Sequence, residues 1–320
     1  MNGAAHRVLP DGRLHLQHGP IDMILRAEGP GAEAAHRAAV ARFQTLLAEL
    51  VAELPLLRQP VAARDCLLRG AVARRMAAAA RAHLPGFVTP MAAVAGAGAE
   101  AVLQAMDAVP GVVRAFVNNG GDIALFFAGD DVAGDDMAAP ASIDPARADA
   151  PAPYRLAVVV NPQDPSSPGV LRIAPRSPFR GVATSGARGR SHSLGIADSV
   201  TVIARSAPQA DVAATLIANA TDLPGDPAII RDPADSLSPD SDLGARLVTT
   251  HVPPLDPVRI DRALDRGEDA ARRMQARGLI GAALIVLQGT ARLVGEMPLA
   301  PAVDPAQNSV THRKESLLHV

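Results

Sequence analysis

The sequence contains very little cysteine and few large aromatic side chains. Cys66 is the single cysteine, tryptophan is absent, and Tyr154 is the only tyrosine among 320 residues. One cysteine excludes an intramolecular disulfide and any metal site built from several cysteines. Because 48% of the residues are hydrophobic and almost none of these are aromatic, the core must be aliphatic and closely packed from small side chains.

Lysine is nearly absent too, with Lys314 as the only example, so arginine carries almost all of the positive charge. The 31 basic and 33 acidic residues almost cancel, and no basic stripe indicates a nucleic-acid partner. The N-terminus has no apolar segment of signal-peptide length, and the apolar run from Leu279 to Leu287 is about half of what a bilayer requires. The composition predicts a soluble, cytoplasmic protein without a membrane partner.

Hydrophobic periodicity predicts an ordered series of helices and strands. Alternating residues on either side of His18-Gly19-Pro20 predict two strands, and helical spacing follows from Gly31 to Leu54 and from Arg64 to His83. Further along the chain we expect strands at 154–160, 170–174, 181–183 and 198–205, helices at 208–220 and 258–275, and a hairpin turning at 288–289.

Two stretches have no apolar periodicity of their own. The segment 129–153 is rich in Asp, Ala and Pro and is predicted to be a flexible insertion, while 224–254 is rich in turn residues. We therefore expect one domain over 1–295, interrupted by the insertion, and a C-terminal tail over 296–320.

A helix rich in alanine and glycine is predicted to begin at Thr89-Pro90, with a hydroxyl cap followed by proline in the first turn. It continues as MAAVAGAGAEAVLQAM, where each interior glycine costs about 1 kcal/mol relative to alanine. Something must approach that backbone closely. Close packing against other elements is one explanation, and a phosphate-bearing ligand at the helix N-terminus is the other.

Other polar groups that could carry chemistry lie near turns and helix starts. The stretch VNNGGDIALF, Val117 to Phe126, predicts a hairpin turn, and Thr184-Ser185-Gly186 is either a second turn or a phosphate-binding corner. Asp211 and Thr215 are four residues apart on a predicted helix and offer either two oxygen ligands for Mg²⁺ or ordinary helix-start chemistry. His192, in a polar loop, is either a general base or a surface histidine.

Several common catalytic motifs are missing. The sequence has no nucleophile elbow, no P-loop and no dinucleotide-binding fingerprint, and its histidines lack the spacing of metal ligands. A serine hydrolase and a histidine-based metallohydrolase are therefore poorly supported.

Taken in order, the segments resemble a known family. HGPIDMIL, TPMAAVAG, VNNGGDIAL, ATSG, a histidine, SVTV and ADVAAT together resemble the ApbE superfamily of flavin transferases, and more closely its uncharacterised ApbE-like branch. The resemblance implies an α/β (α+β) fold with mixed or antiparallel sheets flanked by helices. It also implies binding of FAD with Mg²⁺ and transfer of FMN to a hydroxyl of an acceptor protein.

The resemblance assigns roles to individual residues. The Ala92 carbonyl, Asp211 and Thr215 would be the Mg²⁺ ligands, and His192 would assist proton transfer. The expected nucleotide-facing residues are Thr89, Asn118, Asn119, Gly120, Gly121, Asp122, Thr184, Ser185 and Gly186.

The chain also departs from the transferase pattern. Thr89, Ala95 and Glu100 occupy the places of an Asp, a Lys and a second Asp, and SLGIADSVTV follows the histidine where transferases have Asp-Pro-x-Thr-Gly. The expectation is thus a protein that binds FAD or FMN with Mg²⁺, with FMN transfer as a further step. The alternatives are an inert binding or scaffold module and an enzyme for another fused-ring ligand such as a pterin. Small, close-packing residues also suggest a homodimer.

Overall fold

The computed structural model describes residues 3–61, 67–129, 151–158, 169–189, 191–300 and 318–319. Arg64 and Cys66 lie outside these ranges, as do 130–150 of the predicted insertion and 301–317 and 320 of the predicted tail. The domain boundaries expected from the sequence stay a prediction.

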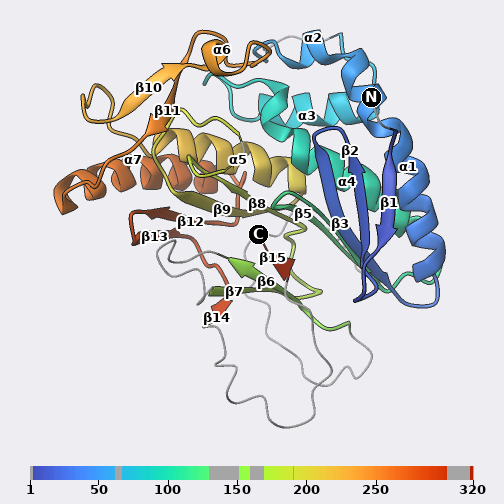
Figure 1. Cartoon of the computed structure of the whole chain (residues 1–320). Helices are drawn as coiled ribbons and strands as arrows, with labels where there is room; N and C mark the ends of the chain where they lie inside the picture. Colours follow the sequence, from blue (N-terminus) through green and yellow to red (C-terminus); the bar gives the residue numbers. More distant parts are fainter. Residues whose placement is uncertain are drawn as a thin grey trace.

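A nine-stranded sheet forms the centre of the described structure (Figure 1). Its order is β1-β2-β3-β4-β5-β8-β9-β12-β13, and each neighbouring pair is antiparallel. The strands are β1 (Ala5–Val8), β2 (Leu14–His18), β3 (Ile21–Glu28), β4 (Arg114–Asn119), β5 (Asp122–Phe127), β8 (Gly181–Ser185), β9 (Ser199–Ala204), β12 (Ala282–Leu287) and β13 (Thr290–Val294).

Two smaller sheets accompany it. One has the order β14-β7-β6-β15, in which β15 runs parallel to β6, and the other pairs β10 with β11. Their strands are β6 (Tyr154–Val158), β7 (Gly169–Ile173), β10 (Ile230–Pro233), β11 (Leu247–His251), β14 (Leu299–Ala300) and β15 (Leu318–His319).

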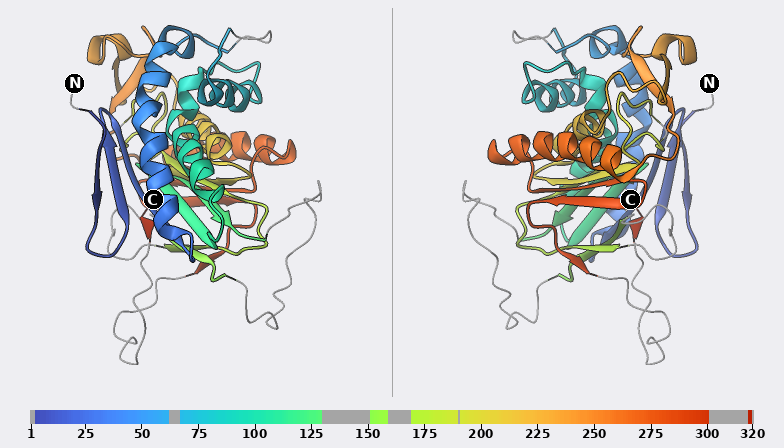
Figure 2. Two further views of the ribbon diagram at one scale, coloured as in Figure 1. Left: turned by 90° about the vertical axis from the view of Figure 1, so that its right-hand side faces the viewer. Right: turned by 90° about the vertical axis from the view of Figure 1, so that its left-hand side faces the viewer.

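Helices cover one face of the nine-stranded sheet, and the β6–β7 sheet lies on the other face (Figures 1 and 2). The helices are α1 (Ala32–Ala52), α2 (Leu54–Leu57), α3 (Ala71–Arg81), the 3₁₀ helix η1 (Pro90–Ala93), α4 (Val94–Asp107), α5 (Ala207–Ala220), α6 (Ala234–Leu237) and α7 (Pro257–Ala276). The predicted fold class, with mixed and antiparallel sheets flanked by helices, is confirmed.

The apolar periodicity of the sequence explains which helix faces are buried. In α1 the buried residues Ala35, Ala39, Phe43, Leu46 and Leu50 recur every three or four positions and so form one stripe. This stripe belongs to the hydrophobic cluster between the helices and the first strands. A separate cluster fills the space between the two larger sheets and is mostly aliphatic, as the composition predicts.

The predicted hairpins are present. Asn119 pairs with Asp122, and the two residues between them, Gly120 and Gly121, both have positive φ, at 66° and 116°. The predicted turn at Gln288-Gly289 joins β12 to β13 in the same way, with φ of 44° and 85°. By contrast, the segment 224–254, for which the sequence predicted a region rich in turns, also holds β10, α6 and β11.

His83 makes the stability of the fold depend on pH. Burial, and secondarily the charge of Arg277, lower the pKa of His83 to about 4. The unfolded chain, with a histidine pKa of about 6.5, binds this proton first. Above about pH 6.5, His83 therefore does not lower the free energy of unfolding. As the pH falls from there towards about 4, the free energy of unfolding declines, by about 2 kcal/mol at pH 5.

Urea unfolding across this pH range should show a weaker pH dependence in His83→Gln than in the wild type. Parallel profiles for variant and wild type would contradict this role.

Candidate functional site

The alanine- and glycine-rich segment forms η1 and α4, and close helix packing explains its first interior glycine. A Cβ on Gly96 would lie 2.5 Å from the carbonyl oxygen of Ala207, at the start of α5. A Cβ on Gly98 would meet only side chains, with Met23 Cε nearest at 3.4 Å. The glycine at 96 is thus required by the α4–α5 contact, which is helix against helix.

Asp211 caps the start of α4 from the neighbouring helix. Its Oδ2 accepts a hydrogen bond of 2.9 Å from the backbone N–H of Gly96, and α4 has no side-chain cap of its own. Burial raises the pKa of Asp211 to about 7, while the N–H groups of Gly96 and Ala95 act in the opposite direction. Asp211 therefore does helix-start chemistry, but for α4 and not for the helix that carries it.

The predicted hydroxyl cap at Thr89 is wrong. Thr89 precedes η1 as expected, but its side chain makes no capping hydrogen bond. Its hydroxyl instead donates to Asp242 Oδ2 at 2.5 Å, across 153 residues of sequence. Thr89 is buried, so this bond joins the helix start firmly to the segment between α6 and β11.

A cleft of about 390 Å³ opens beside these groups, and we call it the α4–α5 cleft. Eight of the predicted site residues line it: Thr89, Ala92, Asp122, Thr184, Ser185, His192, Asp211 and Thr215. They come from five places in the chain, and their convergence is what the resemblance implied. Such a volume is in the usual range for small-molecule sites.

The other predicted residues do not line the cleft. Asn119 Nδ2 donates to the Ala95 carbonyl at 3.0 Å, and Asn118 Oδ1 accepts from Gly121 N–H at 2.8 Å. These bonds shape the turn and attach it to α4. Gly186 lies where a Cβ would be 2.4 Å from the Asp198 carbonyl oxygen, so backbone packing requires it. In the β4–β5 hairpin, only Asp122 lines the cleft, while Gly120 and Gly121 form the turn.

One wall of the cleft was not predicted. Ser238, Asp240, Ser241, Asp242 and Leu243, between α6 and β11, all line it. Their segment is rich in Ser, Asp and Pro, a composition typical of a surface loop, and nothing local in the sequence connects it with α4. Asp242 is held by Thr89, and Asp240 lies 3.4 Å from Arg58 Nη1.

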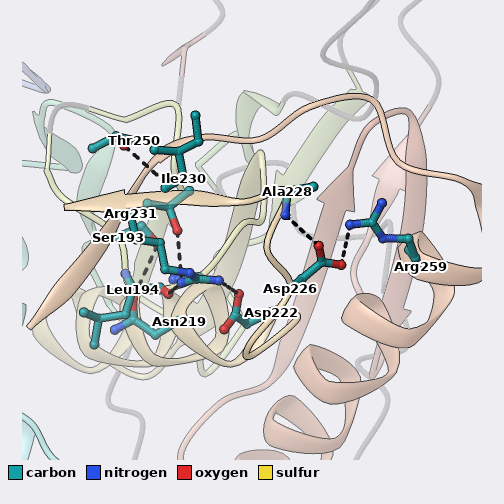
Figure 3. A network of polar contacts seen from close by, with 12 residues as sticks. Ser193, Leu194, Asn219, Asp222, Asp226, Ala228, Ile230, Arg231, Thr250 and Arg259 are labelled. Carbon is teal, nitrogen blue, oxygen red and sulfur yellow. Dashed lines mark hydrogen bonds and ion pairs between the residues drawn. The ribbon is translucent and has the colours of Figure 1, made fainter.

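His192 lines the cleft and is exposed, and the loop that carries it is fixed by contacts with two other segments. Its Nε2 is 3.1 Å from the Ser238 hydroxyl oxygen. Just after it, the N–H of Leu194 donates to Asn219 Oδ1 at 2.9 Å, and the Leu194 carbonyl accepts from Arg231 at 2.7 Å (Figure 3). The half-buried Arg231 also pairs with Asp222 at 2.6 Å, which orients its guanidinium.

The hydroxyls of Thr184 and Thr215, which also line the cleft, differ in their hydrogen bonding. Thr184 Oγ1 is 2.9 Å from Thr201 Oγ1 on the adjacent strand β9. The Thr215 hydroxyl makes no hydrogen bond within the described ranges, so it does not bond back to a carbonyl of its own helix. Its hydroxyl is thus available to a ligand, beside Asp211.

The cleft is acidic. Four aspartates line it, at 122, 211, 240 and 242, and no arginine or lysine among the described residues does so. In the same ranges, no three His, Cys, Asp or Glu side chains gather in a way that would hold a metal. A cation bound here would therefore need backbone, hydroxyl or ligand oxygens in addition to a carboxylate.

None of the described helices has the length and apolarity to cross a membrane.

Comparison with known proteins identifies the family. Residues 6–293 match the family model described as "AbpE bacteria", so the chain belongs to this family and the resemblance is confirmed. A UPF0280 protein from Methanoregula boonei is 34% identical over 181 residues, which are 55% of this chain and 66% of the relative, just under two thirds of its length.

Solved structures of similar topology include two flavin transferases. The apo form of the flavinyl transferase ApbE of Pseudomonas stutzeri aligns over 93% of both chains, with 12% identity and a TM-score of 0.40. The flavin transferase ApbE of Vibrio cholerae aligns over 91% of this chain and 96% of that one, with 12% identity and a TM-score of 0.33.

Proposed function

We propose that the α4–α5 cleft binds a flavin nucleotide, FAD or FMN, together with Mg²⁺, and that the protein transfers FMN from FAD to a hydroxyl of an acceptor protein. The observation that carries this proposal is the convergence of the Ala92 region, Asp211, Thr215, the Thr184 corner and His192 on one cleft. Family membership supports the choice of ligand.

The donor groups suit Mg²⁺. Asp211 offers a carboxylate, Thr215 an unengaged hydroxyl, and Ala92 a backbone carbonyl on the same cleft. These are hard oxygen donors, and Mg²⁺ is commonly held by one or two carboxylates with phosphate oxygens completing its shell. When bound, such an ion neutralises charge on the phosphates.

The charge of the cleft supports a requirement for the cation. Asp211 and Asp242 would repel a pyrophosphate, and although Arg58 pairs with Asp240, the described lining offers no arginine or lysine to bind the phosphates. A divalent cation between carboxylate and phosphate reverses this balance, so we expect nucleotide binding to be weak without it.

The apolar part of the lining suits a fused ring. Met91, Leu216 and Leu243 face the cleft along with Phe87, whose ring has the Arg246 guanidinium 3.3 Å from its centroid. Aliphatic and thioether groups contact a flat ring favourably, and the Arg246 contact fixes the ring of Phe87 in place.

His192 is the proposed general base. It would accept the proton of the acceptor hydroxyl while the hydroxyl oxygen forms a bond to the FMN phosphorus and the bond from that phosphorus to the AMP phosphate breaks. We expect His192→Gln to lower the transfer rate about a hundredfold, at the lower end for loss of a general base, and to leave flavin binding unchanged. Covalent flavin fluorescence on denaturing gels of a protein extract incubated with FAD and Mg²⁺ measures the rate. An unchanged rate would remove His192 from the mechanism.

Flavin fluorescence titration of the purified protein, with FAD and with FMN, in Mg²⁺ and in EDTA, tests the proposal. We expect saturable binding that requires Mg²⁺. Absence of binding under both conditions would contradict the flavin assignment. Binding without covalent flavin on any protein of the extract would contradict the transfer step and identify a binding module.

A further inference from the structure

A second concavity lies apart from the α4–α5 cleft and shares no lining residue with it. This pocket, of about 250 Å³, lies between the loop that follows α5 and the outer face of α7, and we call it the α7 pocket. Its polar lining includes Asp222, Asp226, Arg262 and Arg266.

Both carboxylates of the α7 pocket already have basic partners. Asp222 accepts from Arg231 at 2.6 Å, and Asp226 pairs with Arg259 and also accepts from the N–H of Ala228 (Figure 3). In consequence the pKa of Asp226 is lowered, first by the hydrogen bond from Arg259. The charge of Arg262 lowers the pKa of Asp226 further, but less than the hydrogen bond from Arg259 does. Each acid thus has its close ion pair with an arginine outside the pocket lining.

Arg262 and Arg266 have no such close partner. Neither makes an ion pair or a side-chain hydrogen bond within the described ranges, although both line the pocket. Four residues apart on α7, they project from the same face, and two like charges at this spacing destabilise an isolated helix by about 0.2–0.5 kcal/mol. An anion between them would remove this repulsion.

The wall opposite the arginines offers a further donor. Gly225 lines the pocket with a φ of +77°, and its N–H donates no hydrogen bond among the described residues. A guanidinium presents a planar fork that matches the oxygens of phosphate, and two forks with a backbone N–H suit a compact anion with several oxygens.

We propose that the α7 pocket binds a phosphate group, either as inorganic phosphate or as the end of a small phosphate monoester. The volume of about 250 Å³ is below the usual range for drug-sized ligands and favours a small ion over a nucleotide. With Asp222 and Asp226 paired, the two remaining arginines match the charge of a dianion.

Isothermal titration with sodium phosphate, and separately with glycerol 3-phosphate, tests the proposal in EDTA, which prevents cation-dependent binding in the α4–α5 cleft. We expect saturable binding that weakens at least about tenfold in Arg262→Gln/Arg266→Gln, since each lost charge-assisted bond contributes on that order. The double variant Arg272→Gln/Arg273→Gln changes the charge of the same helix equally, outside the pocket, and should bind like wild type.

Binding of only one of the two compounds decides which source of phosphate the pocket accepts. Absence of saturable binding for both, or equal weakening in the two double variants, would overturn the proposal. Both arginines of the pocket are exposed, so the variants should fold, which circular dichroism would verify. Absence of phosphate binding in the α7 pocket would leave the flavin proposal intact, because flavin binding is tested at the α4–α5 cleft, with variants such as Asp211→Ala, and the two sites share no lining residue.

Discussion

Asp211→Ala is expected to weaken Mg²⁺-dependent flavin binding roughly a thousandfold, because it removes the only carboxylate among the three proposed cation ligands. The same change removes the hydrogen bond from Gly96 N–H to Asp211 Oδ2. Loss of this cap should lower the free energy of unfolding by about 1 kcal/mol. Flavin fluorescence titration measures the first effect and urea unfolding the second.

Asp211→Asn separates the two effects. The amide oxygen still accepts from the N–H of Gly96, so stability should stay near that of wild type, while the negative charge is lost. We expect Asp211→Asn to be nearly as defective in flavin binding as Asp211→Ala. Wild-type affinity in Asp211→Asn, measured in Mg²⁺, would show that Asp211 is a structural cap and not a cation ligand.

Gly96→Ala is expected to lower the free energy of unfolding by about 3 kcal/mol, at the upper end for overpacking. Its Cβ would lie 2.5 Å from the Ala207 carbonyl oxygen and 2.6 Å from the carbonyl carbon. Both are backbone atoms, which cannot turn aside like a side chain, so α4 and α5 would have to separate. Urea unfolding of the purified variant measures the loss.

Gly98→Ala, one half-turn further along α4, is the matched control. Its Cβ would be 3.4 Å from Met23 Cε and 3.5 Å from Asn119 Nδ2, which are ordinary contacts. The better helix propensity of alanine should then leave stability unchanged or raise it by up to about 1 kcal/mol. Equal losses in the two variants would contradict the assignment of the close α4–α5 contact to Gly96 alone.

Much of the fold could be predicted because its signals are local. The two glycines at 120 and 121 have the positive φ that a tight hairpin requires, and the apolar stripe of α1 has helical spacing. The region 224–254 could not be predicted in this way. Its two strands pair across thirteen intervening residues, and their hydrogen bonds depend on partners that no short window contains.

The candidate site was predictable only in part, for a similar reason. Residues such as Asp211, Thr215 and Thr184 belong to short motifs, and the cleft brings them together. Asp242 belongs to no motif, and its position follows from a hydrogen bond to Thr89 far away in the sequence. The close approach at Gly96 was predicted, but whether a helix or a ligand makes it depends on tertiary structure. The homodimer stays a prediction.

The most direct test of the flavin–Mg²⁺ proposal is the position of the cation in a crystal grown with FAD and Mn²⁺ in place of Mg²⁺. Anomalous scattering locates manganese without reference to the surrounding density. We predict a peak within about 2.5 Å of the Ala92 carbonyl oxygen, an Asp211 carboxylate oxygen and Thr215 Oγ1, the coordination range of such ions. A peak beside Asp240 and Asp242 instead, or bound flavin with no peak, would contradict the account.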